Sequence, residues 1–191
     1  VIPLPQSIAI GRGPVFTITA DTQIIVLPGD DLRVARIARA LSELIGISAS
    51  PNAPRVQTGG GMIPPGSIVL ALDAPAAGAE GYDLSITPER ATISASQPAG
   101  LFYGVQTLVQ LVRRDPLGNW LLPTGTIRDW PQYELRICHW DTKHHQDRIE
   151  TLKRYLDWSA KFKINMICFE LEDKFAYPSH PQIGQPGAFT P

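Results

Sequence analysis

The sequence has few cysteines and almost no net charge. Its two cysteines, Cys138 and Cys168, form neither a CxxC motif nor a dense disulfide framework. Lysine and arginine total 17 against 18 aspartate and glutamate residues, and no basic block occurs. This balance makes nucleic acid and anionic membranes poor candidates as partners. No apolar run approaches the roughly 20 residues of a membrane span. The H-E-x-x-H motif is absent too, which excludes a metalloprotease on ligand grounds.

What is present is typical of a globular protein. Apolar residues make up 43% of the 191 residues and charged residues 18%, a composition too apolar for a disordered chain. This length suits one large domain, or one domain and part of another.

The chain begins with strands and a strong helix. Alternating apolar and polar side chains predict a strand at residues 14–20, and a second apolar stretch follows at 23–27. A stripe of apolar side chains predicts a helix from Asp30 to Ile45, for which Gly46 is a suitable C-terminal stop. The composition of residues 50–67 predicts a loop.

A buried strand, a hairpin and a second helix follow. Residues 67–72 are apolar on both faces, which predicts a central strand, and residues 82–87 and 91–96 predict a β-hairpin. Residues 99–114 predict a helix whose wide apolar stripe should be covered by the sheet and by a neighbouring element. We therefore expect an α+β domain, a small sheet with two helices.

The organisation changes at Trp130–Pro131, because proline disfavours helix in the residue before it and cannot donate to a sheet ladder. Residues 134–141 and 164–173 then predict strands, and residues 148–163 predict an amphipathic helix. A strand, a helix and a strand in succession form a βαβ unit, with parallel pairing and a right-handed crossover.

This final segment is short for the architecture that it indicates. Two parallel strands and one helix cannot cover both faces of a sheet. The segment is roughly a quarter of the length of a (β/α)8 barrel. We expect residues 1–130 to form the α+β domain and residues 131–191 to form the start of a truncated (β/α)8 barrel.

An ordered series of motif positions runs through the second half of the chain. The helix carries the pattern G-x-x-Y-G-x-Q-T-L-x-Q-L, and an I-x-D-x-P pattern follows. The matching positions are Gly100, Tyr103, Gly104, Gln106, Thr107, Leu108, Gln110, Leu111, Ile127, Asp129, Pro131, then Arg136 and Asp141 in the first strand of the βαβ unit, and Lys163, Asn165 and Asp173 around the second. This series resembles the family 20 glycoside hydrolases, the β-N-acetylhexosaminidases.

The resemblance implies a scaffold domain, zincin-like in shape, followed by a catalytic barrel. It implies hydrolysis of terminal β-linked N-acetylhexosamine, in which the acetamido oxygen of the substrate is the nucleophile. An Asp that orients this group and a Glu that protonates the leaving oxygen would follow the fourth barrel strand, beyond Pro191. We therefore expect no catalytic residue, cofactor or metal in this chain, and no activity from the chain alone.

The resemblance also implies substrate-binding roles for Arg136, Asp141, His145 and Asp173. An arginine in a parallel strand cannot face the apolar layer between strand and helix without a large penalty. We expect Arg136 to point into the barrel and to donate to the 3- and 4-hydroxyls of the sugar. The alternative is a structural ion pair with Asp141 or Glu170.

The sequence departs from the family pattern at several positions. Ile137 replaces a glycine, Cys168 and Glu170 replace the two histidines of an H-x-H-x-x-D pattern, and His144 replaces an arginine. The segment after Leu171 also lacks the common form. These departures indicate a divergent branch.

Two other interpretations of the polar residues are weaker. His139, Asp141, His144 and His145 offer atoms for a metal, but the loop after the strand decides where the last two point. A loop histidine satisfied by neighbours is the simpler expectation for both. Glu172 and Asp173 do not suit an acid–base pair, because adjacent residues of a strand face opposite sides.

Three functions stay open. The first is the N-terminal part of a β-N-acetylhexosaminidase, with an amino-sugar glycoside as its substrate. The second is a stand-alone carbohydrate-binding or interaction module, and the third is a related barrel glycosidase acting on another acetamido sugar. Because the second strand of residues 134–173 would have an open edge, we expect self-association through this segment. The alternative is that this segment stays loosely ordered while the domain up to about residue 130 remains folded.

Overall fold

The chain forms two units. The structure, a computed structural model, describes residues 1–27, 31–49, 54–59, 61–72, 77–142 and 145–191. Unit 1 comprises Val1–Gln132 and unit 2 comprises Tyr133–Pro191.

Unit 1 is built on one mixed sheet. Its strands are β1 (Ser7–Ile18), β2 (Gln23–Val26), β3 (Arg55–Thr58), β4 (Ser67–Ala71), β5 (Tyr82–Ile86), β6 (Arg90–Ala95), β7 (Arg113–Arg114) and β8 (Trp120–Asp129). They lie in the order β1-β8-β5-β6-β4-β2-β3, and β7 pairs with β8. β4 is parallel to both β2 and β6, and β2 is parallel to β3, whereas β1, β5, β7 and β8 make antiparallel pairs.

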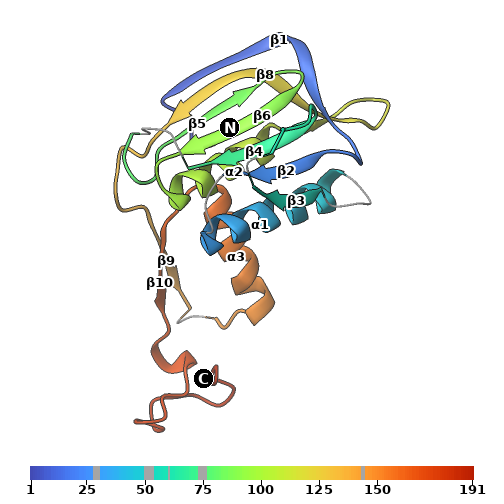
Figure 1. Cartoon of the computed structure of the whole chain (residues 1–191). Helices are drawn as coiled ribbons and strands as arrows, with labels where there is room; N and C mark the ends of the chain where they lie inside the picture. Colours follow the sequence, from blue (N-terminus) through green and yellow to red (C-terminus); the bar gives the residue numbers. More distant parts are fainter. Residues whose placement is uncertain (28–30, 50–53, 60, 73–76, 143–144) are drawn as a thin grey trace. The chain divides into compact units, whose positions relative to one another are not determined.

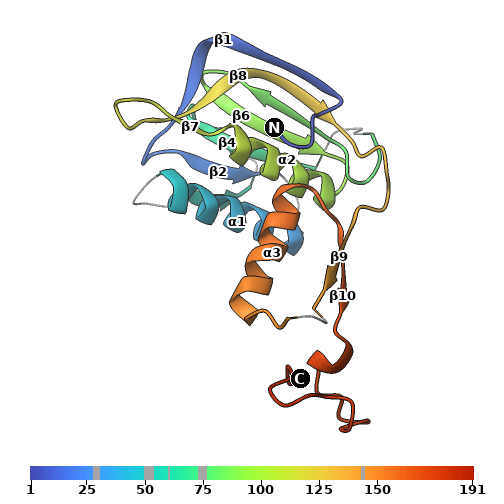
Figure 2. The same ribbon diagram turned by 180° about the vertical axis from the view of Figure 1, so that it is seen from behind.

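Two helices, α1 (Leu32–Ala49) and α2 (Pro98–Leu111), cover the same face of this sheet (Figures 1 and 2). α1 contacts β2 and β3, α2 contacts β5, β6 and β8, and the helices contact each other. Their apolar stripes bury the core together with alternate residues of the strands. The core includes Phe16, Ile24, Leu41, Ile68, Leu70, Leu84, Ile93, Leu101 and Leu108. Among the described residues, no helix is long and apolar enough to cross a membrane.

Most predicted elements of unit 1 are confirmed. All five residues of β4 are buried, as expected of a central strand. β5 and β6 form the predicted hairpin, with Leu84 opposite Ile93. α2 is covered by the sheet and by α1, and most of its residues are buried. The α+β class, with a sheet and two helices, is therefore confirmed for this unit.

Several boundaries were predicted wrongly. α1 continues through Gly46 to Ala49, and its predicted start at Asp30 lies outside the described residues. α2 ends at Leu111, because Arg113–Arg114 leave the helix to pair with β8. The described part of the predicted loop at 50–67 contains β3, an edge strand that pairs only with β2.

The α2 helix lies unusually close to the sheet at two glycines. A Cβ atom on Gly100 would overlap the carbonyl oxygen of Gly81 and lie 2.8 Å from the Ala95 Cβ. A Cβ atom on Gly104 would overlap the Ile93 side chain and lie 3.1 Å from Cδ2 of Tyr82. Only a residue without a side chain permits this approach.

The close approach brings together a buried polar network. The Tyr82 hydroxyl donates to Oδ2 of Asp129 at 3.1 Å and lies 2.6 Å from the Thr107 hydroxyl. Since the phenol has one proton, Thr107 donates to Tyr82. Burial raises the pKa of Tyr82 far above its usual range; the bond from Thr107 opposes this shift and the charge of Asp129 adds to it. The backbone N–H of Gln6 donates to the other Asp129 oxygen at 3.2 Å.

Unit 2 contains a parallel strand pair and one helix. β9 (Ile137–Asp141) and β10 (Met166–Glu170) pair in parallel and α3 (Ile149–Lys161) connects them; the 3-10 helix η1 (Glu172–Lys174) follows. The predicted parallel pairing is confirmed. Trp140 stacks on Tyr155 of α3, with ring centroids 3.9 Å apart. By strand alternation, Ile137, His139 and Asp141 therefore occupy the face of β9 away from α3.

We predict that Gly100→Ala destabilises unit 1 by about 1–3 kcal/mol, because the new methyl group must displace the Gly81 backbone or lift the helix. Alanine favours a helix over glycine by about 1 kcal/mol. A net loss of stability would therefore come from the clash and not from helix propensity. Urea denaturation followed by circular dichroism measures the change.

Gly13→Ala is the matched control, since among the described residues a Cβ atom there meets nothing within 4 Å. Its effect should stay within about 0.5 kcal/mol. Equal effects of the two substitutions would show that the helix does not depend on this contact.

Candidate functional site

The polar side chains of unit 2 gather where β9 and β10 end. Parallel strands end at the same edge of a sheet, and binding residues commonly lie at that edge. Here it is formed by the end of β9 with its following loop and by the end of β10 with η1. The side chains at this carboxyl edge are Asp141, His145, Gln146, Asp147, Glu170, Asp173 and Lys174.

A side-chain contact between His139 and Glu170 crosses the two strands on the face away from α3. Nε2 of His139 lies 2.9 Å from Oε2 of Glu170, and both side chains are partly exposed. Glu170 is opposite Asp141 in the strand register. Its backbone carbonyl accepts bonds from both the N–H and the hydroxyl of Thr142, at 3.2 and 2.8 Å. The end of β9 is therefore fixed to the end of β10.

The loop after β9 holds His145 through a carboxylate. Nε2 of His145 lies 3.2 Å from Oδ2 of Asp147. The indole N–H of Trp140 donates to the same oxygen at 3.4 Å. His145 is thus an exposed loop histidine with a neighbouring partner. His144 lies outside the described residues.

Asp173 is held by a lysine that sequence reasoning did not single out. Nζ of Lys174 lies 2.9 Å from Oδ1 of Asp173 and donates to Oε1 of Gln185 at 3.1 Å. Gln146 donates to the carbonyl of Gly187 at 2.8 Å, which ties the loop after β9 to the segment after η1. No sequence pattern links Lys174 with Gln185 or Gln146 with Gly187, because these two contacts join segments that are apart along the chain.

Arg136 lies at the opposite end of β9. Nε of its guanidinium donates to the carbonyl of Lys163 at 2.6 Å and Nη1 to that of Tyr133 at 2.8 Å. It lies five positions before Asp141 in the chain, which is about 16 Å along a strand. The structure therefore brings Asp141, His145 and Asp173 to one edge and leaves Arg136 out of that group.

The other motif positions near Arg136 join it in a structural cluster. The side-chain carbonyl of Asn165 accepts the backbone N–H of Arg136 at 2.9 Å, and its amide donates to the carbonyl of Glu134 at 2.7 Å. Lys163 has a left-handed φ of 62°. This cluster fixes the turn between α3 and β10, and the predicted sugar contact of Arg136 stays a prediction.

Glu172 and Asp173 lie in η1 and not in a strand, so the predicted strand alternation does not apply to them. Glu172 has a left-handed φ of 45°. Among the described residues, no three His, Cys, Asp or Glu side chains are arranged to hold a metal ion.

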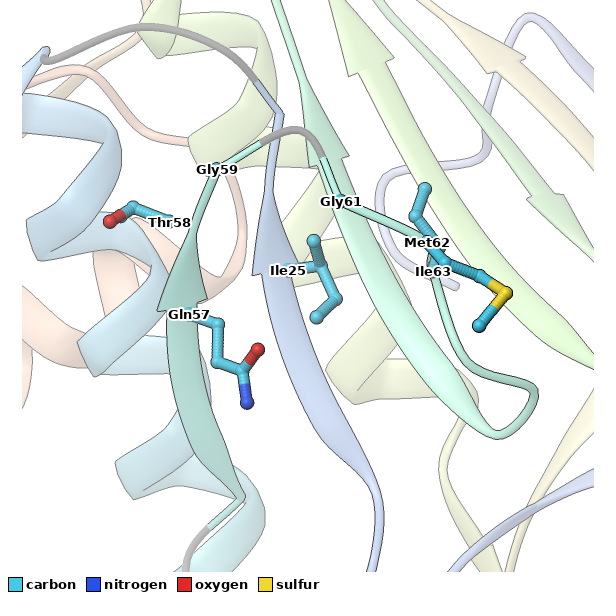
Figure 3. Close-up of a pocket in the computed structure, with 7 residues that line it drawn as sticks. All are labelled: Ile25, Gln57, Thr58, Gly59, Gly61, Met62 and Ile63. Carbon is cyan, nitrogen blue, oxygen red and sulfur yellow. The ribbon is translucent and has the colours of Figure 1, made fainter.

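Unit 1 offers less chemistry. A cavity of about 120 Å³ lies beside β2 and β3 (Figure 3). None of the described residues that line it has an ionisable side chain: Ile25, Gln57, Thr58, Gly59, Gly61, Met62 and Ile63. On the sheet face away from the helices, Asp83 is paired with Arg128 at 2.9 Å. Among the described residues, the polar edge of unit 2 is therefore the better candidate site.

Comparison with known proteins identifies the family. The family model described as "Glycosyl hydrolase family 20, domain 2" matches residues 1–130. The chain belongs to glycosyl hydrolase family 20, and unit 1 has the fold of its domain 2. The resemblance of the sequence to this family is confirmed.

Relatives cover the whole chain. A β-N-acetylhexosaminidase of Cellulomonas fimi is 31% identical over 197 residues, which is 100% of this chain and 38% of that protein. The structure of a β-N-acetylhexosaminidase from Streptomyces coelicolor A3(2) matches 96% of this chain and 38% of its own, with a TM-score of 0.82 and 34% identity. The chain thus spans well under half of the length of these relatives.

A further match is a Streptomyces plicatus N-acetyl-β-hexosaminidase. A mutant of that enzyme, solved in complex with its product GlcNAc, has a TM-score of 0.83 and 33% identity. It covers 100% of this chain and 41% of its own.

We predict that Arg136→Ala loosens unit 2, because it removes two bonds from a charged donor to backbone carbonyls, each worth about 1.5–3 kcal/mol. Hydrogen exchange of the β9 and β10 amides should accelerate. Arg154→Ala, on the exposed surface of α3, is the control and should leave exchange unchanged. Unchanged exchange in Arg136→Ala, with weaker sugar binding by a longer active protein, would instead support the sugar contact that the resemblance implies.

Proposed function

We propose that this chain is the N-terminal part of a glycosidase that removes terminal β-linked N-acetylhexosamine. Unit 1 is its scaffold, and unit 2 is the first strand, helix and second strand of its catalytic barrel. The observation that carries the proposal is the match, over 100% of this chain, to a hexosaminidase that binds GlcNAc as its product. The parallel βαβ connectivity of unit 2 supports the barrel assignment.

We assign Asp141, His145 and Asp173 to the sugar-facing edge of this barrel. Carboxylates accept hydrogen bonds from sugar hydroxyls, and such charge-assisted bonds are stronger than neutral ones. Asp147 orients the imidazole of His145 through their 3.2 Å contact. Glu170 is opposite Asp141, and His139 holds its carboxylate. These groups bind and orient a polar ligand.

The reaction itself would follow the substrate-assisted, retaining course that the family resemblance implies. The acetamido oxygen of the substrate forms the bond to the anomeric carbon while a Glu protonates the leaving oxygen. An Asp orients the acetamido group. Both acidic residues would come from later barrel strands, so the part played by this chain is binding and orientation.

We predict that the 191-residue chain does not hydrolyse 4-nitrophenyl N-acetyl-β-glucosaminide, because the general acid and the orienting group are both missing. The proposed longer protein should hydrolyse it under the same conditions. A panel of other aryl acetamido glycosides distinguishes a related specificity.

Turnover by the purified chain, free of host enzyme, would contradict the proposal. Asp141 and Glu170, which are paired in the register of β9 and β10, would then be the carboxylates to test for a catalytic role. Calorimetry tests the remaining alternative, a stand-alone carbohydrate-binding module. Binding of N-acetylglucosamine by the chain more tightly than about 1 mM, roughly −4 kcal/mol, would favour a stand-alone carbohydrate-binding module.

We also predict that the chain self-associates through unit 2. Among the described residues, its sheet has two strands, so neither β9 nor β10 pairs with a third strand of this unit. Ile137 and Met166 are 46% and 47% exposed on the face away from α3, and apolar surface of this kind favours burial. Light scattering should show species larger than a monomer, and a monomer whose unit 2 resists protease as well as unit 1 would contradict this.

A further inference from the structure

Lys174 is buried although it lies in a short surface helix. Its side chain is 10% exposed, whereas that of Asp173 is 45% exposed. A lysine in such a segment is normally solvated, and a buried ammonium needs partners for its three donors. Lys174 has two in the Asp173 carboxylate and the Gln185 side-chain carbonyl, at 2.9 and 3.1 Å.

The backbone around Lys174 is fixed by the returning chain. The N–H of Gln185 donates to the carbonyl of Asp173 at 2.9 Å, and the N–H of Phe189 donates to that of Lys174 at 2.7 Å. The N–H of Ala176 donates to the carbonyl of Phe189 at 2.8 Å. Residues 175–189 therefore fold back on η1, with the Lys174 side chain between them.

The backbone before Asp173 is strained. Glu172 has a φ of 45°, a conformation that non-glycine residues adopt only where the surroundings impose it. Gln146, from the loop after β9, donates to the carbonyl of Gly187, which lies in the segment 175–189. The contacts of Gln185 and Phe189 thus hold the backbone of η1, which carries the Asp173 side chain.

We propose that Lys174 is a positioning residue for Asp173, resting on the proposed function for the identity of the ligand. Lys174 holds Oδ1, so that the half-exposed carboxylate presents Oδ2 to a hydroxyl of the amino sugar. The sugar hydroxyl donates and Oδ2 accepts. Without the ammonium, the carboxylate can rotate and the contact is lost for a large fraction of the time.

Kinetics of the longer enzyme test this role with Lys174→Met, Lys174→Arg and the control Lys153→Met, an exposed lysine of α3. A contact made equally in the ground state and the transition state affects KM and not kcat. Lys174→Met should raise KM about tenfold with little change in kcat. Lys174→Arg should restore most of the affinity, and Lys153→Met should behave as wild type.

A second substitution separates positioning from packing. In an Asp173→Asn background, Lys174→Met should raise KM no further, because the group that it positions no longer carries the charge. An unchanged KM in Lys174→Met, a fall in kcat alone, or additive effects in the double variant would overturn the proposal.

Hydrogen exchange on the 191-residue chain gives a readout that needs no activity. Lys174→Met should accelerate exchange of the Gln185 and Phe189 amides, which are bonded to Asp173 and Lys174. Lys153→Met should not. If the wild-type enzyme hydrolyses none of the aryl acetamido glycosides, the proposed function fails. Exchange then decides alone: faster exchange supports Lys174 as the residue that holds Asp173, and unchanged exchange overturns it.

Discussion

The contact between α2 and the β5–β6 hairpin is the constraint on which unit 1 depends. Gly100 and Gly104 are one helical turn apart on the face of α2 that meets these strands. Any larger residue would push the helix away from the strands. The Tyr82 hydroxyl would then lose its contact with Thr107, and the loss of a hydrogen bond between two buried hydroxyls is costly.

The same contact explains why several family motif positions are polar or small without taking part in chemistry. Thr107 and Asp129 belong to two separate motifs, and both bind the hydroxyl of Tyr82. Gln110 accepts the N–H of Ile2 and donates to its carbonyl, at 2.8 and 2.9 Å, so it holds the start of the chain. The motif residues Thr107, Gln110 and Asp129 of unit 1 therefore have structural contacts, and the candidate functional residues lie in unit 2.

In unit 2, the residues that fix the backbone and the proposed binding residues lie at opposite ends of β9. At its amino end, Arg136 and Asn165 bond to backbone groups and fix the turn before β10. Asp141 and His145, at the carboxyl end of β9, and Asp173, in η1 after β10, carry exposed or partly exposed polar side chains. A strand that is anchored at one end by main-chain contacts holds the groups at the other end in defined positions, which is what a binding site requires.

The sequence predicted the parts of the fold whose side chains repeat regularly. The β5–β6 hairpin follows the strand period, α2 follows the helical period and β4 is apolar on both faces, and the structure contains all of them. β3 has one partly buried apolar residue, Val56, so it carries too little pattern to be recognised.

β8 was also missed, because it contains Pro123 and Gly125. Gly125 is required there: its φ is 147°, and a Cβ atom would overlap the carbonyl oxygen of Ala9 on β1. Such a contact between distant strands has no signal in the sequence of either one.

The candidate site shows the same division. Asp141 and Asp173 could be placed at one edge because parallel strands end together. The substrate-binding role of Arg136 was predicted from the family resemblance. A resemblance identifies the type of residue at a motif position, but it does not show at which end of the strand its side chain lies. The contact of Lys174 with Gln185 joins residues 11 apart, and that of Gln146 with Gly187 joins residues 41 apart, through loops without regular pattern.

A crystal structure of the proposed longer protein with N-acetylglucosamine bound tests most directly whether unit 2 begins a sugar-binding barrel. The expected result is a third parallel strand paired with the free edge of β10, and the sugar at the carboxyl edge within hydrogen-bond distance of Asp141 or Asp173. An unpaired β10, or a sugar bound at the Arg136 end of β9, would contradict it.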